Sequence, residues 1–309
     1  MSEIADFNQL KIDKSWVTVG AFDGVHRGHQ QLVRHLVEQA HRDNSPAVVI
    51  TFHPHPAIFF GRVAQGYTLT APEEREALLR SLGVDEVVTL QFNAELANLT
   101  ALNFMQQLRD HLGLSHLLIG FNFALGRDRT GDLDSLQQFG KYLNYKVEVV
   151  HPVKIDGDVI SSSFIRNLLQ EGQLKQANAM LGRPYSLEGK VIHGEHRGNQ
   201  LGFPTANLEI APERLLPIRG VYASRGQVGG KTYMAVTNIG VRPTFKNPLD
   251  SPRVEPHLLD LKEDLYGKNL KIELLEYLRP EQTFESPAAL IEQVNRDIKE
   301  AREILSNGE

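Results

Sequence analysis

The chain has 309 residues, of which 41% are hydrophobic and 23% charged, and its net charge is −5 with histidine neutral. This length predicts two domains of ordinary globular composition, although one large α/β domain also fits. The negative charge and the lack of a long basic run argue against a protein that holds nucleic acid through its phosphates. Cysteine is absent, which excludes disulfides, thiolate zinc sites and a cysteine nucleophile.

The apolar runs, such as Ala47–Phe52, are too short to span a bilayer. The first fourteen residues are mixed in charge and contain no apolar segment of the kind found in secretory signals. We therefore expect a cytoplasmic protein, a monomer or weak homo-oligomer, with no nucleic-acid or membrane partner.

The first half alternates apolar strands with amphipathic helices. We predict strands at Val17–Ala21, Ala47–Phe52, Val84–Leu90, His116–Gly120 and Lys146–Val150. We predict helices at His29–Ala40, Leu102–Leu112, Leu133–Leu143, Phe164–Leu169 and Leu174–Leu181. A further helix is predicted to begin at the capping-box pattern of Thr70–Glu73. These repeats predict an α/β domain, with a Rossmann-like parallel sheet covered by helices on both faces.

The pattern changes near Arg183–Pro184, so we predict domains at residues 1–183 and 184–309. Strands are predicted at Gly220–Gln227, Lys231–Asn238, Val254–Leu259 and Leu270–Leu278, the first two joined by a Gly229-Gly230 hairpin. Such spacing favours a small barrel or a sandwich. A final helix begins after Ser286, and its apolar stripe from Leu290 to Leu305 is expected to cover the barrel.

A first candidate site is the strand–turn–helix junction VGAFDGVHRGHQQL. Its glycines, Gly20, Gly24 and Gly28, let the backbone approach a ligand closely. His26 and His29 stand three residues apart at a helix start, where free N–H groups and the helix dipole attract anions. This pattern suits a polyphosphate, although a tight βα turn with two surface histidines fits the spacing equally well.

Two further clusters follow predicted strands of the same sheet. In ISSSFIRNLL, Ser163 and Arg166 can bring a hydroxyl and a guanidinium together, and arginine is the preferred partner of a phosphate oxygen. Asn122 lies in the glycine-bearing loop GFNFALG. Because loops at the carboxyl ends of parallel strands build the ligand crevice, these residues are expected to converge with the histidines.

The second half has its own candidate site in HGEHRGNQLGFPTANL. Gly198 and Gly202 permit close approach, and Pro204 stiffens the backbone before Thr205. Thr205 and Asn207 offer the hard oxygen ligands that suit Mg²⁺ held mainly by nucleotide phosphates. Glu255 lies in a predicted strand and can accept a proton from a substrate hydroxyl, although a glutamate pointing to water also fits.

Taken together, the chain resembles the prokaryotic bifunctional FAD synthetases, in which riboflavin kinase is fused to FMN adenylyltransferase. The resemblance covers essentially the whole chain. Its motifs stand in family order: GAFDGVHRGH, TFHPHP, ISSSFIR, LGRPY, LGFPTANL, NIGVRPTF, VEPHLLDL and DLYG. It implies a nucleotidyltransferase domain followed by a Greek-key β-barrel, with ATP, riboflavin and FMN as substrates, FAD as product and Mg²⁺ as cofactor.

The resemblance also implies roles for individual residues. In the adenylyltransferase half it implies ATP and phosphate binding by Gly20, Phe22, His26, Gly28, His29, Asn122, Ser163 and Arg166, with His29 and Arg166 catalytic. In the kinase half it implies ATP or flavin binding by Gly198, Gly202, Pro204, Thr205 and Asn207, Mg²⁺ at Thr205 and Asn207, and Glu255 as catalytic base.

Some positions depart from the family pattern. Ser163 replaces a common Thr, Leu125 replaces a second aromatic, and Asn199 stands where a basic residue is frequent. Pro256 removes an N–H beside the expected base, so we predict an edge position or a bulge there. Two other functions stay open: an adenylyltransferase of a single activity on another nucleotide, and a non-catalytic flavin or nucleotide sensor.

Overall fold

The computed structural model describes residues 4–5, 11–63, 66–121, 123–155, 157–193, 203–240 and 253–306. The chain forms two compact units, Met1–Ser162 and Ser163–Glu309. Residues 163–183, which we assigned to the first domain, are thus grouped with the second unit. Our functional boundary at 183/184 stays a prediction. In the described part of the chain, no helix is long and apolar enough to cross a membrane.

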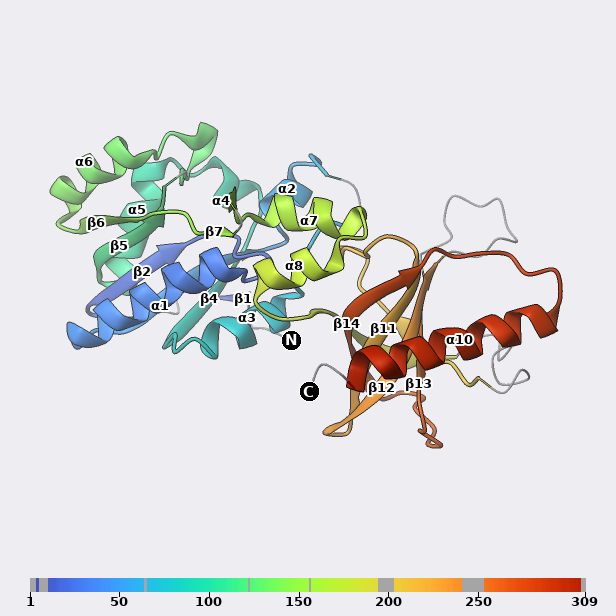
Figure 1. The fold of residues 1–309 in the computed structure, drawn as a ribbon. Helices are drawn as coiled ribbons and strands as arrows, with labels where there is room; N and C mark the ends of the chain where they lie inside the picture. Colours follow the sequence, from blue (N-terminus) through green and yellow to red (C-terminus); the bar gives the residue numbers. More distant parts are fainter. Residues whose placement is uncertain are drawn as a thin grey trace. The chain divides into compact units, whose positions relative to one another are not determined.

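The first unit contains a six-stranded parallel sheet of order β1-β4-β3-β2-β5-β6 (Figure 1). Its strands are β1 Ile4–Ala5, β2 Ser15–Val19, β3 Ala47–His53, β4 Glu86–Gln91, β5 Leu114–Gly120 and β6 Lys146–Val150. All five predicted strands are present, with ends shifted by a few residues. The two-residue β1 was not predicted, because so short a strand leaves no pattern.

Helices cover both faces of this sheet, as predicted. They are α1 Arg27–Arg42, α2 Pro56–Phe59, α3 Pro72–Arg80, α4 Ala94–Asn98, α5 Ala101–Leu112 and α6 Leu133–Leu143. One apolar cluster joins α1 and α3 to the sheet, and a second joins α5 and α6 to it. A short 3₁₀ turn, η2 Arg127–Arg129, and a two-stranded hairpin, β7 Lys154–Ile155 with β8 Asp158–Val159, complete the unit.

The start of α3 corrects the predicted capping box. The helix N-cap is Ala71, and Glu74 accepts a hydrogen bond from the Ala71 amide at 3.4 Å. Thr70 does not cap the helix, because its hydroxyl accepts from the Gly24 amide at 3.1 Å and lies 3.3 Å from Asp23. The capping pattern therefore sits one residue later than we predicted.

The second unit begins with helices α7 Ser162–Gln170 and α8 Leu174–Leu181, followed by a closed antiparallel barrel. The barrel strands are β9 Tyr185–Ile192, β10 Asn207–Glu209, β11 Gly220–Val228, β12 Lys231–Gly240, β13 Arg253–Leu258 and β14 Asn269–Arg279. Their order is β10-β13-β12-β11-β14-β9, in which β14 returns beside β11 as a Greek key requires. Gly229 and Gly230 have φ of 56° and 78°, as the predicted tight hairpin demands.

Helix α10, Pro287–Ser306, lies along the barrel (Figure 1). Ser286 caps it as predicted, because its hydroxyl accepts from the Ala289 amide at 3.2 Å. The carboxyl-terminal half of the apolar stripe, Ile298, Ala301 and Leu305, packs against β11 and β12. Leu290 and Val294, nearer the helix start, instead line a cavity described below.

The predicted bulge at Pro256 is wrong, whereas the predicted edge position is found on the side of β13 that faces β10. Pairing between β12 and β13 runs through Thr237 and Pro256 without a register shift, inside a closed barrel. The Pro256 carbonyl accepts from the Ala206 amide at 2.9 Å, so the missing N–H faces the segment just before β10 begins. Proline is tolerated there because the ladder with β10 has not yet started.

Candidate functional site

The turn between β2 and α1 stands at the carboxyl end of the parallel sheet. Phe22 and Val25 have φ of 46° and 38°, unusual values for residues with side chains. The turn is tied to β3, since the Thr51 hydroxyl donates to the Ala21 carbonyl at 3.1 Å and the Gly20 amide donates to Ile50. The backbone is thus held in a strained shape, of the kind that clusters at ligand-binding turns.

The structure brings His26 and His29 together. Their rings stack with centroids 3.7 Å apart and planes inclined by 16°. His26 caps α1, because its Nδ1 accepts from the His29 amide at 3.3 Å. A nitrogen that accepts carries no proton, so neutral His26 holds its proton on Nε2. The helix start therefore presents an imidazole N–H beside its free amide groups.

Gly28 permits this stack. A Cβ at Gly28 would lie 3.2 Å from the His26 ring, and one at Gly20 would lie 3.1 Å from the Phe22 ring. The Phe22 ring contacts His29 edge-on, with centroids 5.1 Å apart. Gly28 thus packs against His26, and Gly20 packs against Phe22, while the ATP-binding role of these three residues stays a prediction.

His29 is half-buried and uncharged. Burial lowers its pKa well below the ordinary 6.5, and the nearby His26 and Arg75 lower it further. Its Nδ1 is buried without a hydrogen-bond partner among the described residues. His29 thus offers a neutral imidazole to an anion.

The structure does not test whether the remaining residues predicted for this half join the histidines. Asn122 lies outside the described residues. Ser163 and Arg166 are on α7, in the second unit, and Arg166 is 6% exposed. Their convergence with the histidines stays a prediction. Leu125, which replaces an aromatic residue of the family pattern, is partly buried and packs against the core of the sheet.

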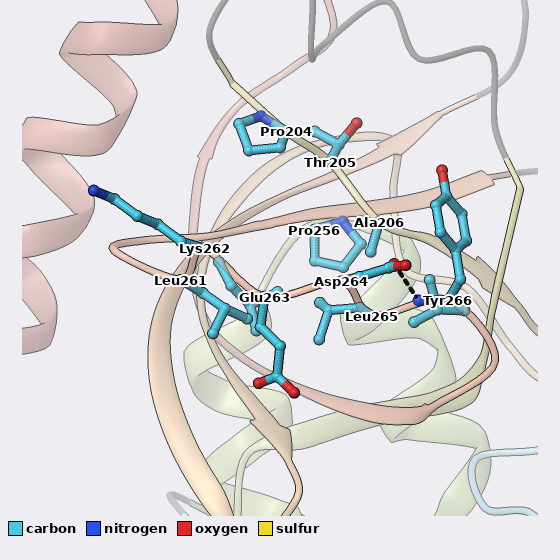
Figure 2. Close-up of a pocket in the computed structure, with 12 residues that line it drawn as sticks. Pro204, Thr205, Ala206, Pro256, Leu261, Lys262, Glu263, Asp264, Leu265 and Tyr266 are labelled. Carbon is cyan, nitrogen blue, oxygen red and sulfur yellow. Dashed lines mark hydrogen bonds between the residues drawn. The ribbon is translucent and has the colours of Figure 1, made fainter.

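The barrel unit holds two cavities that share Thr205. The first, of about 390 Å³, is bounded by Val191, Pro204–Ala206, Pro256, Leu258 and the segment Leu261–Tyr266. Figure 2 shows the Lys262, Glu263 and Asp264 side chains along this segment, with the Asp264 carboxylate accepting from the Tyr266 amide at 2.9 Å. The Tyr266 ring stacks on His193 at 4.0 Å. This cavity is therefore lined by both charged and aromatic side chains.

The second cavity, of about 350 Å³, contains Glu255. Its walls include apolar side chains from the barrel and from α10, namely Phe203, Val221, Val236, Phe284, Leu290 and Val294. Glu255 stands on β13 opposite Asn238 of β12, and an Arg253 guanidinium nitrogen lies 3.7 Å from its carboxylate. Thr205 and Glu255 thus flank one common space, and Thr205 alone also borders the first cavity.

Sequence reasoning missed one ion pair in this cavity. Arg279, the last residue of β14, donates from Nε and Nη2 to the Asp297 carboxylate of α10 at 2.7–3.2 Å. Gln293 donates to the same carboxylate at 2.9 Å.

Gly198 and Gly202 lie outside the described residues, as does Asn199, while Asn207 begins β10 and is half-buried.

Comparison with known proteins identifies the family. Residues 9–164 match the FAD synthetase family model, and residues 181–305 match the riboflavin kinase model. The chain belongs to the family of bifunctional riboflavin kinase/FMN adenylyltransferases. It is 39% identical to the member from Pseudomonas fluorescens over 94% of this chain and 92% of that one, and 36% identical to the Bacillus subtilis member over 95% and 93%.

A solved structure has the same fold over the whole chain. It is a crystal structure described as a macrolide-efflux protein from Streptococcus pneumoniae, with a TM-score of 0.85 and 31% identity, covering 97% of each chain. The histidine turn falls within the first matched region, and Thr205 and Glu255 fall within the second, whereas Arg166 lies between the two.

Proposed function

We propose that this chain makes FAD in two steps. The barrel transfers the γ-phosphoryl group of ATP to riboflavin, giving FMN, and the histidine turn directs transfer of AMP from a second ATP to FMN, releasing pyrophosphate. The observation that carries the proposal is the pair of cavities that meet at Thr205, only one of which contains Glu255.

The position of Glu255 supports an assignment of the two cavities. The acceptor in the kinase step is the neutral ribityl 5′-hydroxyl, which gains from a base within reach. Riboflavin therefore occupies the cavity of Glu255, whose apolar walls suit a flat ring system. ATP occupies the cavity beside Lys262 and Tyr266, and its terminal phosphate reaches the acceptor at Thr205.

The donor set at Thr205 and Asn207 fits Mg²⁺. A hydroxyl and a carboxamide are hard oxygen ligands, and two such groups suit a cation bound chiefly through phosphates. Among the described residues, no cluster of three His, Asp or Glu side chains forms a dedicated metal site. When bound, Mg²⁺ would neutralise charge on the transferred phosphoryl group.

The adenylyl step requires a different arrangement. The nucleophile is the FMN phosphate, which is already anionic, so no base is needed. The chain must instead place two anions together and stabilise the departing pyrophosphate. The start of α1, with the His26 and His29 rings stacked over it, offers N–H donors for this purpose, and we propose that Ser163 and Arg166 contribute further donors.

Several broader properties belong to the same proposal. We propose a cytoplasmic enzyme, monomeric or weakly self-associating, that binds no nucleic acid, with the functional boundary at residues 183/184. The net charge of −5 supports the lack of a nucleic-acid partner.

Two single variants test the assignment. Glu255→Gln is expected to abolish FMN formation from riboflavin and to leave FAD formation from supplied FMN unchanged, and His29→Gln to do the reverse. The flavins are separated by chromatography after incubation with ATP and Mg²⁺. Kinase turnover within a few-fold of the parent in Glu255→Gln would refute the base. A parent that makes no flavin nucleotide would support a sensor, and one that makes only FAD from FMN would support a single adenylyltransferase.

A further inference from the structure

A buried cation stands in the sheet unit that no motif of the sequence singled out. Arg75, on α3, is 2% exposed. Its Nη2 donates to the Phe52 carbonyl at 3.0 Å, at the carboxyl end of β3. Its Nε is buried without a hydrogen-bond partner among the described residues. Burying a charged arginine without pairing all of its N–H groups costs free energy, so its presence here needs a structural or functional explanation.

The helix that carries Arg75 is attached to the histidine turn. Asp23, 1% exposed, accepts from the Leu69 amide at 2.8 Å and from the Thr70 amide at 3.1 Å. The Thr70 hydroxyl in turn accepts from Gly24. The segment that leads into α3 is thus fixed to the turn between β2 and α1, so Arg75 and the two histidines belong to one rigid assembly.

We propose that Arg75 is a positioning residue of the adenylyl-transfer site, a buried cation on the helix fixed to the histidine turn, and that it makes this turn receptive to a polyphosphate. The inference rests on the proposed adenylyl transfer and adds a residue to it. Arg75 need not touch the substrate, because a buried charge acts over several ångströms in a medium of low dielectric.

Electrostatics supports this role. Burial, then the charge of His26 and then the charge of Arg75 lower the pKa of His29, so the His29 ring stays neutral and brings no positive charge. The charge that an ATP polyphosphate needs must then come from elsewhere. Burial lowers the pKa of Arg75, while the charges of Asp23 and Glu73 oppose that change, and a guanidinium remains protonated. Arg75 therefore supplies positive charge that the neutral His29 does not.

The test compares three variants of the full chain. Arg75→Gln removes the charge, Arg75→Lys keeps it without the planar fork, and Arg80→Gln removes an exposed arginine from the same helix as a matched control. Three quantities are measured: FAD formation from FMN, FMN formation from riboflavin, and the pKa of His29 by NMR, with its signals assigned through His29→Gln.

Arg75→Gln is expected to lower kcat/KM for FAD formation about tenfold or more, the usual effect of losing a charged contribution to a phosphoryl site. Its riboflavin kinase activity should stay within about twofold of the parent, and the His29 pKa should rise. Arg75→Lys should keep the His29 pKa low and recover most of the activity. Arg80→Gln should match the parent in all three measurements.

The proposal is overturned if Arg75→Gln matches Arg80→Gln in FAD formation, or if the His29 pKa does not move. It is also overturned if Arg75→Lys fails as badly as Arg75→Gln, since that result points to packing alone. If Arg75→Gln does not fold, the Arg75→Lys comparison still decides. A parent that makes no FAD from FMN refutes the proposed function, while the NMR measurement separately tests the effect of Arg75 on His29.

Discussion

The lowered pKa of His29 makes the stability of the sheet unit depend on pH. Because the folded-state pKa of His29 is lowered below its ordinary 6.5, folding favours the neutral ring. The resulting stability is fully present above about pH 6.5 and is lost as the pH falls toward the folded-state pKa. Within that window a single group of this kind changes the free energy of unfolding by up to about 1.4 kcal/mol per pH unit.

We predict that His29→Gln flattens the acid side of the stability profile. Trp16 is the single tryptophan of the chain and lies in the sheet unit, so its fluorescence follows the unfolding of that unit in urea. The pKa of His116, which stacks on Trp16 at 3.9 Å, is also lowered, and comparing parent with variant cancels its contribution. Equal slopes between pH 6.5 and 5 would contradict the prediction.

The sequence could identify His26 and His29 because their spacing at a helix start is local. It could not identify Asp23 or Arg75. Asp23 acts on Leu69 and Thr70, 46 and 47 residues away, and such contacts leave no local pattern. Arg75 stands in the run P-E-E-R-E, which is typical of a solvent-exposed helix start, and only the fold shows that it is buried.

At the scale of elements, β14 and α10 are joined beside the Glu255 cavity by one buried ion pair. We predict that Arg279→Met destabilises the barrel by about 3–5 kcal/mol, because Asp297, 2% exposed, would keep a buried charge without its partner. The KM for riboflavin should rise more than kcat falls, since Leu290 and Val294 of α10 line the same cavity.

Circular dichroism and Trp16 fluorescence together measure this effect. The barrel contains no tryptophan, so its unfolding appears in circular dichroism alone. Arg279→Met should shift that transition and leave the fluorescence transition in place. The double variant Arg279→Met/Asp297→Leu should regain part of the loss, because it removes both charges. A single variant as stable as the parent would show that the pair does not stabilise the barrel.

Elements with a strong period were predicted well, and short or interrupted ones were not. Helix α8 and strand β6 have the bounds that the apolar spacing predicts. Strand β9 was missed, although Tyr185, Leu187 and Val191 alternate inward, because Gly189 interrupts the pattern. That glycine is required by the barrel, since a Cβ there would lie 2.2 Å from the Glu209 carbonyl. Barrel closure and the cavities depend on pairings that no local signal encodes.

At the scale of the whole molecule, the two proposed reactions depend on different residues. His26 and His29 belong to the first unit, and Thr205 and Glu255 belong to the second. FMN is a stable small molecule, so the first product can leave one chain and bind to another. Each reaction therefore needs only its own site to be intact, whichever chain carries it.

We predict that a mixture of His29→Gln and Glu255→Gln proteins makes FAD from riboflavin, although neither does so alone. FMN made by the first variant should accumulate before FAD appears, and the delay should shorten as the Glu255→Gln protein is increased. Chromatography of the flavins at successive times measures both quantities. If the mixture made FMN but no FAD, while Glu255→Gln alone still converted supplied FMN at the same concentration, FMN would have to pass between sites of one chain without release.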